Sequence, residues 1–136
     1  MKVKKLWVDG EKIFILTDDE RELWQSLLWY PRLLKASVEQ RQNYEIDNSG
    51  IRWEDVDEDM SLDSFLYDNP EPVGVARIFR QHPELNVSAI ARRLGMKQSL
   101  SAAYISGNKK PSKEREKEII NVVKQIGQEL IEEPIY

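Results

Sequence analysis

Few side chains in this sequence of 136 residues have the chemistry of a catalytic or metal centre. It has no cysteine, which excludes disulfides and thiolate metal sites and is typical of a reducing cytoplasm. Its single histidine, His82, excludes the two-histidine zinc hydrolase motif. The acidic run at residues 55–59 suggests a calcium loop, but Met60 and Leu66 stand where that loop needs glycine and glutamate. We therefore predict that the protein is not an enzyme and binds no metal or cofactor.

The basic side chains are concentrated in one part of the chain. Residues 1–69 hold 9 Lys or Arg against 16 Asp or Glu, a net charge of −7, whereas residues 70–136 hold 11 against 8, a net charge of +3. Within the second half, residues 86–117 hold 8 against 2, a net charge of +6 that can neutralise several phosphates. The two prolines of Asp68-Asn69-Pro70-Glu71-Pro72 disfavour helix before them. We therefore predict two modules, residues 1–69 and 70–136, with different partners.

The second module has the pattern of consecutive helices, predicted at residues 73–81, 88–94 and 98–106 and after Ser112. Ala91 is small enough for the second and third helices to cross closely, and Gly95 can take the positive φ of a tight turn. We expect Gln98 and Ser99 to open the third helix with side chains that face outward. The buried side chains of this helix pair are predicted to be Ile90, Leu94, Met96 and Tyr104. The last helix has an apolar stripe formed by Ile119, Val122, Val123, Ile126 and Leu130.

Residues 87–107 resemble, without a gap, the helix-turn-helix of the lambda-repressor-like family, and residues 107–112 are similar to the loop after its recognition helix. The resemblance implies that residues 98–106 enter the major groove of double-stranded DNA, with Gln98 in bidentate contact with adenine. The predicted base contacts are Lys97, Gln98, Ser99 and Ala103. The predicted contacts with the DNA backbone are Ser88, Arg92, Arg93, Ser106, Lys109 and Lys110.

The chain departs from the lambda-repressor-like pattern at two positions. Val87 stands where the family usually has a glutamine that touches phosphate. Ser101 stands where the family buries a branched aliphatic side chain, and we expect Leu100 to take over that buried position after a small rotation of the helix.

The first module has the pattern of a small antiparallel sheet with short helices. Strands are predicted at residues 3–8 and 12–17, joined by an Asp9-Gly10 turn, and at residues 21–25 and 51–53. Short helices are predicted after Pro31, after the capping box that Ser37 starts, and over residues 62–67. The fold class is therefore predicted to be α+β, a sheet module followed by an all-α helix-turn-helix domain.

The first module also resembles an uncharacterised bacterial family known as domain of unknown function twenty-four forty-two. The resemblance rests on Leu6-Trp7-Val8-Asp9-Gly10, on residues 27–34, on Gly50-Ile51-Arg52-Trp53 and on Asp59-Met60-Ser61. That family has no established catalytic residues to transfer. Some relatives carry a C-terminal repressor-like domain, and their genes often lie beside small toxin-like genes, which implies an antitoxin role.

We therefore predict a cytoplasmic transcriptional regulator of the prokaryotic type that binds double-stranded DNA sequence-specifically as a homodimer. The acidic module would face away from the duplex, because it repels phosphate, and would serve dimerisation or partner binding. The alternative is an antitoxin-like or adaptor protein whose first module binds a protein partner such as a toxin. No apolar run approaches twenty residues, so no membrane partner is predicted.

Overall fold

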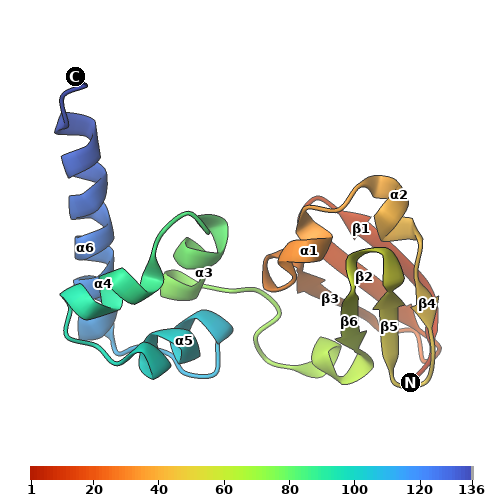
Figure 1. The fold of residues 1–136 in the computed structure, drawn as a ribbon. Coiled ribbons are helices and arrows are strands. Elements are labelled where there is room, and N and C mark those ends of the chain that lie inside the picture. Colours follow the sequence, from red (N-terminus) through yellow and green to blue (C-terminus); the bar gives the residue numbers. More distant parts are fainter. Residues whose placement is uncertain (136) are drawn as a thin grey trace. The chain divides into compact units, whose positions relative to one another are not determined.

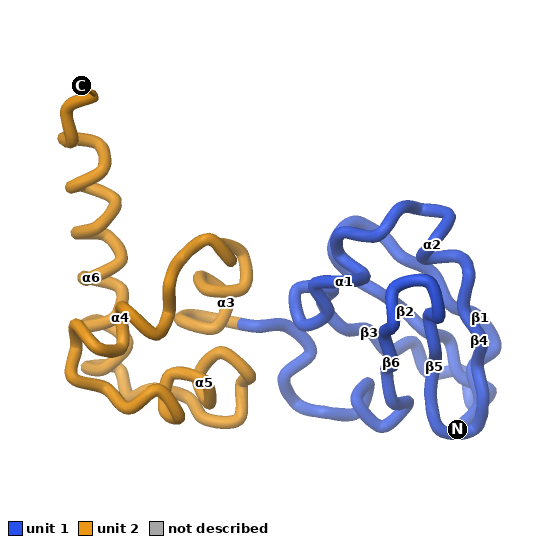
Figure 2. The backbone as a smooth tube through the Cα atoms, viewed as in Figure 1, with its two compact units in different colours: residues 1–72 blue, residues 73–136 orange. Residues whose placement is uncertain are grey.

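The computed structural model describes residues 1–135 and divides the chain into two compact units, residues 1–72 and 73–136 (Figures 1 and 2). The first unit contains antiparallel sheets and short helices, and the second consists of helices. We call them the sheet unit and the helical unit. This mixed composition, with the sheets before the helices, agrees with the predicted fold class at that level.

The first sheet of the sheet unit joins β1 (Val3–Asp9), β2 (Lys12–Thr17) and β3 (Glu22–Ser26) in antiparallel order. The three predicted strands are confirmed to within one residue. The tight β1–β2 connection needs the positive φ of Gly10, which is +60°. One face of β2 is completely buried because alternate residues, Ile13, Ile15 and Thr17, point into the core with no exposed surface.

A second antiparallel sheet contains β4 (Glu45–Ile46), β5 (Gly50–Trp53) and β6 (Glu58–Ser61). The prediction of a single strand here was incomplete, because β4 is only two residues long and β6 is largely polar. The short helices are η1 (Leu27–Trp29), α1 (Pro31–Leu34), α2 (Val38–Gln42), η2 (Glu54–Val56) and η3 (Leu62–Leu66). The predicted capping box of Ser37 is present, with Ser37 Oγ accepting from the Gln40 amide at 3.1 Å. The buried core consists of Ile13, Ile15, Leu27, Leu33, Ile51, Trp53, Met60, Leu62 and Phe65.

The outer face of the first sheet carries a row of aromatic side chains that crosses all three strands. Trp7 is paired with Phe14, and Phe14 with Trp24. The rings of Trp7 and Phe14 stack with centroids 5.3 Å apart. The ammonium of Lys5 lies 5.2 Å from the Trp7 ring and that of Lys12 lies 4.3 Å from the Trp24 ring. The row therefore stabilises the sheet through stacking and cation–π contacts.

The acidic run at residues 55–59 is organised around one arginine of β5. Arg52 forms ion pairs with Glu54 at 3.0 Å, Asp57 at 2.8 Å and Asp59 at 2.7 Å. Asp57 has a φ of +51°, which turns the chain between η2 and β6. The hydrogen bonds from Arg52 lower the pKa of Asp57 below its usual value. The run is therefore held by a cation of the protein itself.

The helical unit contains α3 (Gly74–Gln81), α4 (Val87–Arg93), α5 (Gln98–Ser106) and α6 (Lys113–Glu132), as predicted to within one residue. Its core is built from all four helices and consists of Val75, Phe79, Ile90, Ala91, Met96, Tyr104, Ile119 and Val122. The predicted stripe of α6 is buried only in its first half, because Leu130 is 69% exposed. Ser112 caps α6 by accepting from the Arg115 amide at 3.1 Å. No helix in residues 1–135 is both long enough and apolar enough to span a bilayer.

We expect Arg52→Gln to lower the melting temperature of the sheet unit by a few degrees near pH 7, because three carboxylates lose their shared cation. The pKa of Asp57 is lowered in the folded state. Asp57 therefore contributes to the free energy of unfolding above the unfolded pKa of about 3.9, and this contribution is lost as the pH falls through the folded pKa. The difference between variant and wild type should therefore shrink in acid. All four tryptophans lie in this unit, so their fluorescence reports its unfolding.

Lys35→Gln is the matched control for Arg52→Gln, because Lys35 is exposed and forms no ion pair within residues 1–135. Equal melting temperatures of Arg52→Gln and wild type across this pH range would show that the network contributes nothing to folding.

Candidate nucleic-acid interface

The connection between α4 and α5 is a short turn that depends on one glycine. Gly95 has a φ of +68°, and the amide of Met96 returns to the carbonyl of Ala91 at 2.8 Å. Ala91 itself is only 2% exposed. A larger side chain at this position would therefore push α5 away from α4. The sequence predicted both roles correctly.

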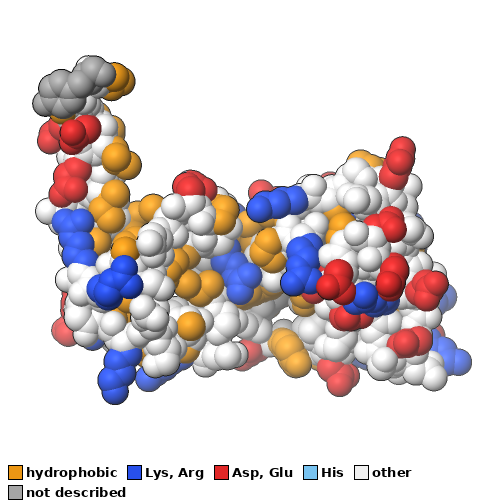
Figure 3. Space-filling model, in the orientation of Figure 1, with side chains coloured by type: hydrophobic (Ala, Val, Ile, Leu, Met, Phe, Trp, Pro, Cys, Tyr) orange, Lys and Arg blue, Asp and Glu red, His pale blue; other side chains and the backbone are white. Residues whose placement is uncertain are grey.

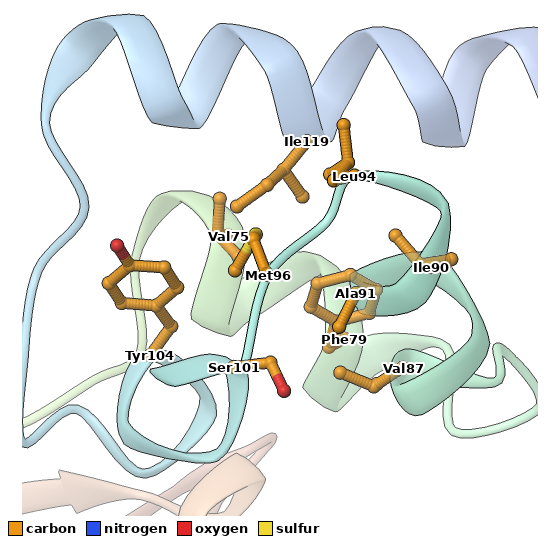
Figure 4. Close-up of a pocket in the computed structure, with 10 residues that line it drawn as sticks. All are labelled: Val75, Phe79, Val87, Ile90, Ala91, Leu94, Met96, Ser101, Tyr104 and Ile119. Atoms are coloured by element: carbon orange, nitrogen blue, oxygen red, sulfur yellow. The ribbon is translucent and has the colours of Figure 1, made fainter. Parts of the chain in front are cut away.

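The inner side of α5 rests on the core through side chains at helical spacing. Tyr104 is buried, as predicted, whereas Leu100 is only half-buried against the core. In Figure 4 the side chains of Val75, Met96 and Ile119 converge beside this helix. The position of α5 is therefore fixed by packing against α3 and α4, which leaves its opposite side exposed.

Ser101 itself is buried, with 8% of its surface exposed, so the prediction that Leu100 would take over its buried position is wrong. Its hydroxyl donates to the Gln98 carbonyl at 2.8 Å, so the polar group is satisfied within its own helix. Ser101 lines an apolar gap of only about 10 Å³, which has no room for a branched aliphatic side chain (Figure 4). The small serine side chain therefore suits this tight core.

The side chains predicted to contact bases lie on the free side of α5 and at its start. Lys97, Gln98 and Ser99 are exposed, and Ala103 is half-buried. Lys97 is the N-cap residue, its side chain makes no capping hydrogen bond, and the first turn contains no acidic residue. The start of α5 therefore presents backbone N–H groups and a cation without a competing carboxylate, which favours an approaching anion.

The side chains predicted to contact the DNA backbone lie on α4 and in the segment after α5. Arg92, Arg93, Ser106, Lys109 and Lys110 are exposed, and Ser88 is half-buried. Figure 3 shows several Lys and Arg side chains projecting from the helical unit, whereas Asp and Glu gather on the sheet unit. Arg93 forms an ion pair with Glu129 of α6, in which Nη2 and Oε1 are 3.6 Å apart. Ser106 closes α5, because its hydroxyl donates to the Ala103 carbonyl at 3.1 Å.

Two polar residues hold this surface in ways that the sequence did not predict. Asn86 caps α4 by accepting from the Ala89 amide at 3.0 Å, so the helix begins one residue earlier than predicted. Arg80 of α3 donates from Nε to the Ile105 carbonyl at 3.1 Å and so places a cation at the end of α5. Burial lowers the pKa of Arg80. Val87 packs against the core, which explains why the start of α4 has no outward polar side chain there.

The sheet unit contains one buried polar cluster, and every member of it has a partner. Gln25 donates from Nε2 to Ser64 Oγ at 2.7 Å, and Tyr30 donates to Gln25 Oε1 at 2.8 Å. Burial raises the pKa of Tyr30 further above neutral pH, where the protonated phenol is a donor. Within residues 1–135, no buried side-chain nitrogen or oxygen lacks a hydrogen-bond partner. The cluster therefore joins β3 to η3 and offers no free reactive group.

Comparison with protein-family models gives a match to "Protein of unknown function (DUF2442)" over residues 3–71. This range covers the sheet unit, and it is the family that the first module resembles in sequence. No curated protein and no solved structure matches the chain.

We expect Ser101→Ala to raise the free energy of unfolding of the helical unit by about 0.5 kcal/mol, because alanine has the higher helix propensity and the lost hydroxyl bonds only to its own helix. Ser101→Ile should instead cost about 1–3 kcal/mol, since the neighbouring gap cannot take its extra carbons. Urea unfolding followed by helical circular dichroism measures both changes. Tryptophan fluorescence of the sheet unit is the internal control, and a stabilising Ser101→Ile would contradict the tight packing.

Proposed function

The chain belongs to the family described as protein of unknown function DUF2442, and from its helical unit, which lies outside the matched residues, we propose that it binds double-stranded DNA sequence-specifically. The biological role that we propose is that of a transcriptional regulator of the prokaryotic type. The helical unit would act as a lambda-repressor-like helix-turn-helix domain, with α5 as the recognition helix.

One observation carries the proposal: α5 is held from one side by the core, while the opposite side of its first turn is exposed and free of acidic residues. An α-helix fits the major groove of B-DNA when one side is open along its length. The Ala91–Gly95 turn supports this use, because it fixes the direction of α5 relative to α4.

The reading of bases is assigned to the exposed first turn of α5. The amide of Gln98 carries a donor and an acceptor, which match the N7 and N6 groups of adenine. Ser99 would contact the neighbouring base, and the methyl group of Ala103 would contact a thymine methyl group. Lys97 would reach a guanine or a phosphate. These assignments rest on exposure together with the helix-turn-helix resemblance.

The positioning of the DNA backbone is assigned to exposed cations on both sides of α5. Lys109 and Lys110 follow the helix, and Arg92 comes from the end of α4. Arg93 would exchange Glu129 for a phosphate, and Ser88 and Ser106 would donate weaker contacts. Each neutralised phosphate contributes about −0.9 to the logarithmic salt slope, so these cations should make affinity strongly dependent on salt.

Selection of binding sites from random duplex pools, repeated at low and at physiological salt, tests the proposed function. We expect one enriched sequence with two-fold symmetry at both salt concentrations, because a homodimer would present two copies of α5. Enrichment of a site without symmetry would argue against the dimer but support base reading. No enrichment even at low salt would contradict DNA recognition by this protein.

We expect Gln98→Ala to weaken binding to the selected site by about 1–3 kcal/mol and to leave binding to random duplex nearly unchanged. Gln125→Ala on the exposed surface of α6 is the matched control, because it removes the same side chain away from α5. Fluorescence anisotropy with labelled duplexes measures both affinities. Equal losses on the two duplexes would show that Gln98 does not discriminate bases.

An antitoxin-like or adaptor role is the second candidate, and the charge of the sheet unit favours it. Residues 1–69 have a net charge of −7, which would repel DNA and attract a basic protein. In this role the sheet unit would bind a partner such as a toxin. Co-purification of the full chain with the product of a co-transcribed gene would support this role.

A further inference from the structure

A groove of about 460 Å³ lies in the sheet unit, where the edge of the first sheet meets α2 and the segment after it. Its apolar lining consists of Leu6, Trp7, Val8, Val38 and Tyr44. We call it the β1–α2 groove. Val38 is 68% exposed although it is aliphatic, and Tyr44 is half-buried. The groove therefore has apolar surface that the folded unit leaves in contact with water.

One wall of the β1–α2 groove is the free edge of a sheet. The strand order is β1-β2-β3, and no strand in residues 1–135 other than β2 pairs with β1. Such an edge presents backbone N–H and C=O groups that can bind another strand. An irregularity between Val3 and Lys5 disturbs the start of the strand, whereas the register from Lys5 to Asp9 is regular. The regular part is the part that lines the groove.

The charge of the groove is opposite to that of the unit around it. Arg41 is its one charged lining residue, and its Nε and Nη2 donate to the Leu33 and Leu34 carbonyls at 2.9 and 2.7 Å. It has no carboxylate partner in the part of the chain that the structure describes. The Lys5 ammonium lies against the ring of Trp7 and is likewise without a carboxylate partner there. Arg41 therefore brings one unneutralised cation into an apolar groove, and Lys5 lies against Trp7 of its lining.

We propose that the β1–α2 groove binds an extended acidic segment of a partner protein, which adds to the sheet as a fourth strand beside β1. Backbone hydrogen bonds along β1 would supply affinity, as in other strand-addition complexes. Because side chains of a strand alternate, every second residue would enter the groove against Leu6 and Val8. An acidic side chain of the segment would pair with Arg41. This site lies in the sheet unit and does not depend on DNA binding by the helical unit.

A phage library of random eight-residue peptides, panned on the full chain, identifies a probe for this site. We expect the enriched peptides to alternate apolar residues with Asp or Glu. A fluorescein-labelled peptide of the most enriched sequence then gives the affinity by anisotropy. Hydrogen exchange should show new protection of the β1 amides when this peptide is bound.

Val38→Glu is the decisive variant, because it places a negative charge in the groove without disturbing the fold. Val38 is the exposed first residue of α2, where a carboxylate is favourable. We expect Val38→Glu to weaken peptide binding at least about tenfold through like-charge repulsion, and Val38→Lys to bind as well as wild type or better. Leu66→Glu alters an exposed apolar residue of η3 outside the groove and should change nothing.

The proposal is overturned if no peptide is enriched, if the enriched peptides lack acidic residues, or if Val38→Glu binds them as well as wild type does. Sedimentation of the full chain checks for a different occupant. Self-association that Val38→Glu abolishes would identify a second copy of this chain in the groove and would also overturn the proposal of a partner protein.

Discussion

The arrangement of the helical unit depends on one steric constraint, the close crossing of α4 and α5 at Ala91 and Gly95. Because the Met96 amide returns to the Ala91 carbonyl at 2.8 Å, the turn is closed by a hydrogen bond across the position of the small residue. This geometry requires the positive φ of Gly95. Once the crossing is fixed, Tyr104 and Ser101 must point inward, and Gln98 and Ser99 must point outward. The exposure of the first turn of α5 is thus a consequence of packing on its other side.

The sheet unit obtains its stability from a different source. Its core is aliphatic and aromatic, but its outer surface is strongly acidic, and like charges on a small unit oppose folding. Arg52 offsets this repulsion within the acidic run, because one guanidinium binds Glu54, Asp57 and Asp59. Lys5 and Lys12 lie against tryptophan rings instead of carboxylates. The sheet unit therefore uses several of its few cations for specific contacts, and Arg41, which donates to the Leu33 and Leu34 carbonyls, is the cation that lines the β1–α2 groove.

The elements that could be predicted from the sequence are those with strong local signals. The β1–β2 hairpin has alternating side chains around Asp9-Gly10, and α5 is bounded by the turn at Gly95 and by Gly107. Interactions between distant residues gave no such signal. The strands β4 and β6 both pair with β5, and Arg80 reaches Ile105 from another helix. For the candidate interface, the sequence identified the exposed residues. Only the structure shows that Arg93 forms an ion pair with Glu129 and that Ser101 lines a gap too small for a branched aliphatic side chain.

If α5 reads bases as proposed, the small number of suitable side chains on it explains why the regulator would need two copies of the chain. Gln98 is the only side chain of the exposed first turn that can make a bidentate contact with a base pair, and such a contact discriminates by about 1–3 kcal/mol. Specific DNA complexes exceed non-specific ones by about 4–10 kcal/mol. Lys97, Ser99 and Ala103 would add further contacts, so the discrimination by one α5 would remain near the lower end of that range. A second α5 on a two-fold related half-site would double the discrimination, while the cations around each helix would supply affinity without specificity.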